Sequence, residues 1–280
     1  MIKYKGQEIK LGAMGWTAII ILAFFLFLAF AAEILAPYGA NEQVDASFLV
    51  PSGQYLLGTD DLGHDIFSLL IWGSRISLLI GICAALLGVS GGVIYGMIAG
   101  YWGGRVDRFL MRGSDIFQSL PNIPLFILIA AYAGSSLRNI VLIISVFAVP
   151  RIGRIIRGQV VSLKHNAYIQ AAGMFGGSSF YLMKRHFFPE ILPLVFTALI
   201  NMVGRAILME SGLAFLGIGD PTSKSWGMIL HYALEYPSTY LTSAWTWWVM
   251  PPSLCIALVC IGFALLGLAL EDLADPRLRI

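Results

Sequence analysis

The feature that most constrains the fold of this chain is its first long apolar run, which extends from Trp16 to Ala36. The run carries one charge, Glu33, close to its end. At about 1.5 Å per residue, a helix of this length spans a hydrocarbon core of ~30 Å. The run is too long for the apolar core of a signal peptide, and no small-residue cleavage sequence precedes the polar region after Pro37. We therefore expect a retained first membrane helix.

The composition extends this expectation to the rest of the chain. Of the 280 residues, 58% are hydrophobic and 12% are charged, whereas soluble domains carry about 25% charged residues. Because lipid satisfies no backbone hydrogen bonds, and alternating strands of a barrel are absent from the sequence, we predict an all-α membrane protein with six transmembrane helices. The five further spans are expected at Ile76 to Gly100, Asp107 to Ala133, Ile140 to Pro150 with an extension through Ile156, Ile191 to Leu216, and Trp247 to Leu270. The third and fourth of the six spans can also merge or shift by several residues.

The distribution of charge predicts the orientation. Most of the 18 Lys and Arg residues lie at the two termini, in the connection before the third span, and in a basic segment from Arg151 to Arg185. The connection from Pro37 to Ser74 holds several acids and no Lys or Arg. Since loops rich in Lys and Arg remain in the cytoplasm, we expect both termini and the basic segment to be cytoplasmic, and the acidic connection to be external.

The basic segment contains a spaced motif. Gln170-Ala171-Ala172 is followed after three residues by Gly176, and after nine more by His186-Phe187-Phe188-Pro189. This pattern resembles the coupling loop of ABC importer permeases, which reads Glu-Ala-Ala, three residues, Gly, nine residues, Ile-x-Leu-Pro. The spacing agrees throughout, while Gln170 stands for the usual Glu and His186 for the Ile.

Five further segments resemble the dipeptide, oligopeptide and nickel branch of these permeases. They are Leu57 to Asp65, in which His64 stands for the usual Arg, Gly73 to Leu78, Gly103 to Asp115, Glu210 to Gly217 with Ser225-Trp226-Gly227, and the tail Asp275 to Arg279. The resemblance implies a type I ABC importer permease bundle and, within it, the second, C-type permease subunit. Residues 1–75 would form an N-terminal cytoplasmic segment, the first membrane helix and an external loop. Residues 76–280 would form a core five-helix permease domain with a cytoplasmic coupling loop at 151–190.

The resemblance also implies the partners. They are a second, related permease subunit, two cytoplasmic ABC ATPase subunits, an external substrate-binding protein and the lipid bilayer of a prokaryotic inner membrane, with no nucleic acid. We expect no cofactor in this chain, because it has no Gly-x4-Gly-Lys-Ser/Thr loop. ATP and Mg would be bound by the partner ATPases. The residues implied to contact the ATPases are Tyr168, Gln170, Ala171, Ala172, Gly173 and Gly176. The alternative is an amphipathic helix that lies on lipid headgroups.

Two other groups of residues are candidate sites. Asp60, Asp61 and Asp65 could contact the binding protein, although a turn rich in Asp and Gly, followed by a helix cap at Asp65 or Ser68, also explains them. They could also form a catalytic carboxylate cluster, which we consider the weaker interpretation.

Arg205 and Glu210 are the most polar positions of the fifth span, and intramembrane charges commonly face a water-filled path. Arg205 is the better candidate for the path, although a structural bond elsewhere explains it equally well. Glu210 could instead lie at the outer membrane interface.

The remaining patterns indicate packing. Gly88, Gly92, Gly96 and Gly100 form a stripe at spacing four, which allows another helix to approach closely. Trp245, Trp247 and Trp248 are typical of an interfacial aromatic belt. The three cysteines and four histidines show no ligand spacing, and we expect no metal site.

The predicted function is that of a permease, not an enzyme. The chain would form half of the path for di- or oligopeptides in a binding-protein-dependent ABC importer and couple it to ATP hydrolysis by partner subunits. Nickel or a nickel chelate is the alternative cargo. An ion-coupled carrier or a channel is the alternative class, although we find no internal repeat of broken helices. The sequence contains no His-Glu-x2-His or Gly-x-Ser-x-Gly motif of a membrane enzyme.

Overall fold

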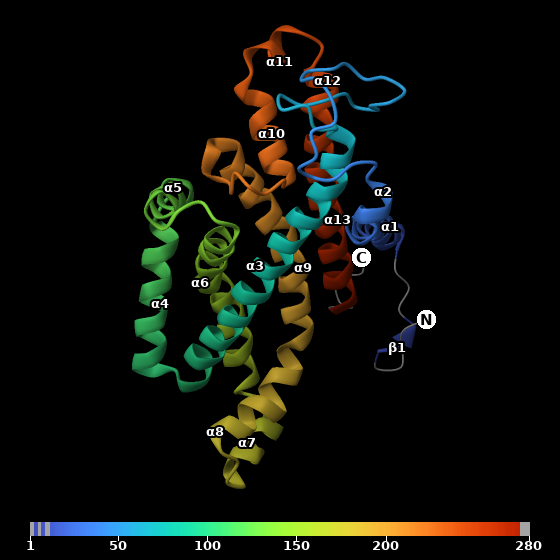
Figure 1. Cartoon of the computed structure of the whole chain (residues 1–280). Helices are drawn as coiled ribbons and strands as arrows, with labels where there is room; N and C mark the ends of the chain where they lie inside the picture. Colours follow the sequence, from blue (N-terminus) through green and yellow to red (C-terminus); the bar gives the residue numbers. More distant parts are fainter. Residues whose placement is uncertain (1–2, 5–6, 9–11, 275–280) are drawn as a thin grey trace.

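The computed structural model describes residues 3–4, 7–8 and 12–274, which are mainly helical (Figure 1). The elements are β1 Lys3–Tyr4, β2 Gln7–Glu8, α1 Ala13–Phe30, α2 Ala32–Leu35, α3 Ile66–Trp102, α4 Gly104–Ser119, α5 Asn122–Ala133, α6 Leu137–Leu163, α7 Ala167–Met174, α8 Ser179–Leu182, the π-helix η1 Met183–Phe187, α9 Phe188–Leu213, the π-helix η2 Ala214–Ile218, α10 Trp226–Glu235, α11 Pro237–Leu241, α12 Trp245–Trp248 and α13 Met250–Ala274. β1 and β2 pair antiparallel. Lys5 and Lys10, and the tail motif Asp275 to Arg279, lie outside the described residues.

The prediction of an all-α membrane protein is confirmed. Within the described part of the chain, five helical segments are long and apolar enough to cross a membrane, and a bent helix pair makes a sixth when it is counted as one span. The five segments are Ala13–Phe30, Ile66–Trp102, Leu137–Leu163, Ser179–Ile218 and Trp245–Glu271.

The third expected span, Asp107 to Ala133, is not one straight helix. It consists of α4 and α5, whose axes differ by 91°. The break lies at Leu120, whose backbone is extended (φ −78°, ψ 138°). The next residue is Pro121, and a proline ring pushes the residue before it out of the helical region. The sequence contained this signal, but hydropathy alone merged the polar and apolar halves into one span.

Two other spans begin or end away from their expected limits. α3 begins at Ile66, so Arg75 lies inside a helix and not in the external connection. Its guanidinium donates to Glu33 Oε1 at 3.0 Å and to the Ala29 carbonyl at 3.1 Å, which ties α3 to α1 and α2. α6 continues through Pro150 to Leu163. The first part of the predicted coupling loop is therefore the end of a membrane helix.

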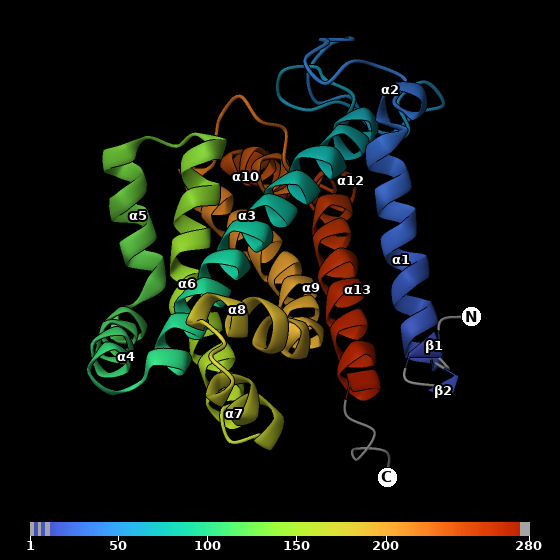
Figure 2. The same ribbon diagram turned by 90° about the horizontal axis from the view of Figure 1, so that it is seen from below.

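α3 lies at the centre of the bundle, where it packs against α6 along its length and also against α9 and α1 (Figures 1 and 2). The glycine stripe faces α6, as the predicted close contact requires. A Cβ on Gly92 would lie 2.6 Å from Cβ of Ile152, and one on Gly100 would lie 2.8 Å from Cβ of Val160. α13 packs between α9 and α1, and α1 forms one flank of the bundle while α5 forms the other (Figure 2).

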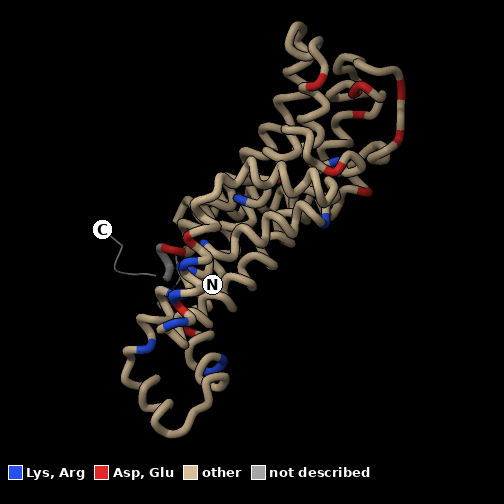
Figure 3. The backbone as a smooth tube through the Cα atoms, turned by 90° about the vertical axis from the view of Figure 1, so that its left-hand side faces the viewer, with Lys and Arg blue, Asp and Glu red and all other residues tan. Residues whose placement is uncertain are grey.

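The two ends of the bundle differ in charge. Acidic residues gather at the end that holds the α2–α3 loop, residues 36–65, while basic residues lie mainly in the half that leads to α7 (Figure 3). Two tryptophans of the expected belt differ in exposure. Trp248 is buried and its ring stacks on Tyr236 at 6.0 Å, whereas Trp245 is exposed. Phe48 from the α2–α3 loop packs edge-on against Trp248, with the ring centroids 5.8 Å apart.

Candidate functional site

The α7 segment, residues 164–182, is held by the ends of three membrane helices. Lys164 follows α6 directly, and its Nζ donates to the Tyr101 carbonyl near the end of α3 at 2.7 Å. The Tyr168 hydroxyl donates to Glu190 Oε1 in the first turn of α9 at 3.3 Å. Burial, and then the charge of Glu190, raise the pKa of Tyr168, so the phenol remains a donor. Movement of α7 is thereby linked to α3, α6 and α9.

Gly176 ends α7 in a left-handed conformation, with φ +87°. The Gly176 N–H donates to the Gly173 carbonyl at 3.1 Å, and the Gly177 N–H donates to the Ala172 carbonyl at 3.2 Å. This pair of bonds is the Schellman arrangement, which satisfies carbonyls left free at a helix end. No atom lies within 4 Å of a Cβ built on Gly176. Glycine is therefore favoured here by backbone conformation and not by lack of space.

The other residues of the motif divide between two faces. Ile169 is buried and Ala172 packs against the bundle core, while Ala171 is half-buried. Gln170 is exposed, and its Nε2 donates to the Lys164 carbonyl at 3.3 Å, so it also covers the end of α6. Gly173 is exposed and has Leu182 as its neighbour, with 3.8 Å from a Cβ at Gly173 to Leu182 Cδ1.

The tip of the segment is apolar and exposed. Met174, Phe175 and Phe180 have exposed fractions of 86%, 92% and 72%. Sequence reasoning did not select them, although three apolar residues within a polar loop were a usable signal. Clustered exposed apolar side chains mark surfaces that bind another protein or a membrane. The tip can therefore supply contact area that the small residues of the motif do not.

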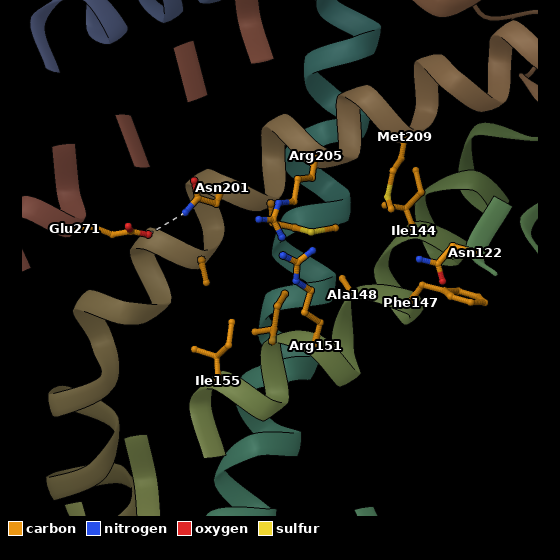
Figure 4. A pocket seen from close by; sticks show the side chains of 13 residues that line it. Asn122, Ile144, Phe147, Ala148, Arg151, Ile155, Asn201, Arg205, Met209 and Glu271 are labelled. Atoms are coloured by element: carbon orange, nitrogen blue, oxygen red, sulfur yellow. Dashed lines mark hydrogen bonds between the residues drawn. The ribbon is translucent and has the colours of Figure 1, made fainter. Parts of the chain in front are cut away.

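A cavity of about 240 Å³ opens between α6, α9 and the end of α13 (Figure 4). Apolar side chains from α6 and α9 form most of its wall. Its polar residues are Asn122, Arg151, Asn201, Arg205 and Glu271. The structure thus places Arg205 on a cavity, as the path interpretation of this residue requires.

Arg151 was not selected from the sequence, because it appeared to lie in a loop. It lies on α6, one residue after Pro150, and its guanidinium points toward that of Arg205 on α9 (Figure 4). Both side chains are exposed to the cavity. On the opposite side, Glu271 accepts a hydrogen bond of 3.5 Å from Asn201 Nδ2.

Glu210 does not line this cavity. Its side chain is 1% exposed. Oε1 accepts from Ser225 Oγ at 2.6 Å, and Oε2 accepts from Ser211 Oγ at 3.4 Å. Ser225 is also the N-cap of α10, since its Oγ accepts from the Met228 N–H. The carboxyl group of Glu210 therefore joins α9 to the start of α10. Its hydrogen bonds lie inside the bundle, whereas the side chain of Arg205 lines the cavity.

The three candidate acids among the five of the α2–α3 loop have different environments. Asp65 is buried, and its Oδ2 accepts from the N–H and Oγ of Ser68 at 2.8 and 2.7 Å, which confirms the predicted helix cap. Asp60 is buried and binds His64 Nδ1 at 2.8 Å and the His64 N–H at 2.7 Å. Asp61 is half-buried and accepts from the Tyr236 hydroxyl at 3.0 Å.

This geometry corrects the assignment of Asp60 and Asp65 to a contact surface, because their side chains are used inside the loop. The loop exposes both apolar and polar side chains. Phe48, Val50, Leu56 and Leu62 are all about half exposed or more. Glu42, Asp45 and Gln54 are also exposed, so a protein that docks on this end of the bundle can contact side chains of both kinds.

The described residues hold no group of three or more His, Cys, Asp or Glu side chains arranged to bind a metal ion.

Residues 92–280 match a protein family described as binding-protein-dependent transport system inner membrane component. Over 275 residues, the chain is 34% identical to the dipeptide transport system permease protein of Bacillus subtilis (strain 168). This alignment covers 98% of this chain and 85% of the relative. The chain is 35% identical over 255 residues to the glutathione transport system permease protein of Pectobacterium atrosepticum, with 90% and 83% covered. It is 33% identical over 263 residues to the probable D,D-dipeptide transport system permease protein of Escherichia coli K12, with 93% and 87% covered. The segment that matches the family contains both α7 and the cavity.

Proposed function

Since this chain belongs to the family of binding-protein-dependent transport system inner membrane components, we propose that it moves di- or oligopeptides across a prokaryotic inner membrane. It is a membrane permease subunit of an ABC importer and not an ATPase. The peptide cargo is supported by relatives whose names specify dipeptide, D,D-dipeptide and glutathione transport.

The proposed complex contains this chain, a second related permease, two ABC ATPases that hold ATP and Mg, and an external binding protein. Both termini and α7 lie on the cytoplasmic side, and the α2–α3 loop lies outside. Residues 1–75 add a first helix and an external loop to a core domain of residues 76–280. The charge asymmetry of the bundle supports this orientation (Figure 3).

The observation that carries the proposal is the α7 segment. Its motif residues Tyr168, Gln170, Ala171, Ala172, Gly173 and Gly176 form a capped helix beside the exposed tip of Met174, Phe175 and Phe180. We assign this surface to the ATPases. The α2–α3 loop lies at the opposite end of the bundle (Figures 1 and 2), where it is free for the binding protein.

The proposed mechanism uses the continuity of α6. This helix passes the cavity at Arg151 and continues without a break to Leu163. Three residues then connect it to α7, which begins after Asn166. When ATP closes the ATPases, α7 moves with them and α6 transmits the movement to the cavity wall. Two states of the bundle then differ in the side to which the cavity opens, and ATP and the loaded binding protein favour one of them.

The test uses the complete importer in proteoliposomes, with ATP inside and binding protein loaded with Ala-Ala outside. Wild type should take up the dipeptide only when ATP is hydrolysed. Phe175→Ala should reduce both uptake and the ATPase activity stimulated by the loaded binding protein at least fivefold. Phe109→Ala is the matched control, because Phe109 is also exposed (79%) but lies on α4.

Three results would contradict the proposal. Unchanged coupling in Phe175→Ala would remove the contact surface from the α7 tip. Uptake without ATP hydrolysis would favour the carrier or channel alternative. ATP-driven uptake of nickel, with none of Ala-Ala, would favour the alternative cargo.

A further inference from the structure

We propose that Arg151 and Arg205 together bind the terminal carboxylate of the cargo as it passes this half of the path. The inference rests on the proposed function and adds to it the chemical group that the path recognises. It concerns the cavity between α6, α9 and α13, which we call the arginine cavity.

The two arginines converge although they are far apart in the sequence. Arg151 comes from α6 and Arg205 from α9, and their guanidinium groups point toward each other across the arginine cavity (Figure 4). Two like charges that face each other repel, and placing charge in a membrane bundle is costly. A bundle that brings two cations together in this way gains most from an anion between them.

Neither arginine has a hydrogen-bond or ion-pair partner among the described residues. Three other arginines on the membrane helices are paired: Arg75 with Glu33, Arg154 with Asp115, and Arg157 with Asp107. The acid of the arginine cavity, Glu271, is bonded to Asn201. Arg151 and Arg205 therefore retain their N–H donors for a ligand, and a guanidinium offers five such donors in a planar fork.

The chemistry of the two guanidinium groups suits the carboxylate of a peptide. The fork of a guanidinium binds a carboxylate through two parallel hydrogen bonds, and every linear peptide with a free C-terminus carries one carboxylate there. Glu271 and Asn201 at the other side of the arginine cavity offer acceptors to the ammonium end of the same molecule. A volume of about 240 Å³ is just under the ~300 Å³ at which ligand pockets begin, which suits half of a site that a second subunit completes.

The arginines should bind the cargo only weakly. A path must release its cargo, so tight binding would stop transport. Both arginines are exposed to the cavity, and an exposed pair of opposite charges contributes only about 0–1 kcal/mol. The arginine cavity is thus suited to transient binding, in which the guanidinium groups replace the water that the carboxylate loses. Selection of the cargo occurs in the binding protein.

The direct test is protection from phenylglyoxal, which modifies arginine side chains. The complete importer in proteoliposomes is treated with the reagent alone, with Ala-Ala, or with Ala-Ala amide, which lacks the carboxylate. Mass spectrometry then gives the rate of modification at each arginine. We expect Ala-Ala to slow modification of Arg151 and Arg205 at least threefold and the amide to have no effect. Arg108 is the reference, because it lies on α4 and bonds only to the Gly104 carbonyl of its own helix. Equal rates with both peptides would overturn the proposal.

The functional test uses Arg205→Gln, Arg151→Gln and Arg205→Lys, with Arg108→Gln as the matched control. We expect at least fivefold lower uptake of Ala-Ala in each Gln variant, while ATPase activity stimulated by the loaded binding protein stays within twofold of wild type. Arg205→Lys should keep at least half of the uptake because it keeps the charge. A purely structural role would lower uptake and stimulation together.

Two results would assign the arginines elsewhere. Wild-type uptake in the Gln variants would overturn the proposal. Loss of the second permease from the purified variant complexes would show that the arginines bind a carboxylate of that subunit, and would overturn it as well. If the wild-type importer takes up no Ala-Ala, the proposed function fails, and the protection assay alone decides the arginine site.

Discussion

The guanidinium of Arg157 on α6 donates two hydrogen bonds to the carboxylate of Asp107 on α4, fifty residues earlier in the chain, with Nη2 and Oδ2 2.6 Å apart. One turn earlier on α6, Arg154 Nη2 lies 2.5 Å from Asp115 Oδ1 near the other end of α4. The two pairs hold the amphipathic helix α4 against the part of α6 that leads to α7. The first pair is mostly buried, with exposed fractions of 33% and 17%, and the second is 45% and 65% exposed.

This difference in exposure predicts unequal effects of mutation. Asp107→Asn should lower the free energy of unfolding by about 1.5–3 kcal/mol, since it leaves a charge-assisted, bidentate acceptor incomplete. Asp115→Asn, the matched control, should cost about 0–1 kcal/mol because water screens the exposed pair. Thermal unfolding of the purified permease measures both. Equal losses would show that burial does not distinguish the two pairs.

Gly176 should tolerate substitutions according to backbone conformation. Gly176→Asn should retain most coupling, because Asn enters the left-handed region readily, whereas Gly176→Val should uncouple ATP hydrolysis from uptake. The conformation costs an ordinary L-residue about 1–2 kcal/mol, and more for a β-branched one. Gly173→Ala is the control inside α7. The ratio of peptide transported to ATP hydrolysed is the measurement, and identical ratios for Asn and Val would rule out this explanation.

Position 170 should tolerate a negative charge better than a positive charge. We expect Gln170→Glu to change transport by less than about tenfold, or ~1.4 kcal/mol, since a neutral hydrogen bond contributes about 0.5–1.5 kcal/mol and an exposed ion pair about 0–1. Gln170→Arg should be more harmful, because it places a long cation on the contact face. Uptake assays compare the two variants. Crosslinking that finds position 170 far from every ATPase residue would contradict the contact, and equal uptake by the Arg variant would contradict the energetic argument.

Cysteines introduced at Ser52 and His165 should be labelled from opposite sides of the membrane. Both residues are exposed, one in the α2–α3 loop and the other just before α7. The native cysteines at 83, 255 and 260 are half-buried and are replaced first. A membrane-impermeant thiol reagent added to intact cells should label Ser52→Cys alone. Labelling of both variants from outside would refute the orientation.

The bond between Asp61 and Tyr236 predicts a dependence on pH. Burial raises the pKa of Asp61 above its usual 3.8, although the hydrogen bond from Tyr236 opposes the change. A carboxyl whose pKa is raised by folding binds its proton more tightly in the folded state, so stability should fall as pH rises from 3.8 through the raised pKa. Thermal unfolding between pH 3.5 and 6 should show a smaller fall in Asp61→Asn. An unchanged profile would exclude Asp61 as the source.

Several features of the site could be predicted from the sequence because they depend on local pattern. The motif from Gln170 to Gly176 was visible from its spacing, and the positive φ of Gly176 gives a physical reason for its glycine. Asp65 was a candidate cap for α3, and its bonds to Ser68 confirm it. These features need only a few neighbouring residues, so their chemistry is visible in one stretch of letters.

The direction of α5 and the position of Arg151 on the cavity could not be predicted from local sequence patterns. Hydropathy over Asp107 to Ala133 measures how apolar a window is, but not whether its two halves share an axis. It also left the end of the fourth span between Pro150 and Ile156, whereas α6 continues to Leu163. The continuation of α6 is stabilised by its packing against the glycines of α3, which lie in a different part of the chain.

Apolar length and residue spacing are properties of single segments, so the letters alone sufficed to identify a bundle of membrane helices and a motif that resembles a permease coupling loop. What the charged residues of those helices contact depended on the tertiary structure. It buried Glu210 against Ser225 and brought Arg205 to face Arg151 in one cavity (Figure 4). The physical reason is that the environment of a charge depends on which helices lie beside it, and that choice is made by packing between segments far apart in the chain.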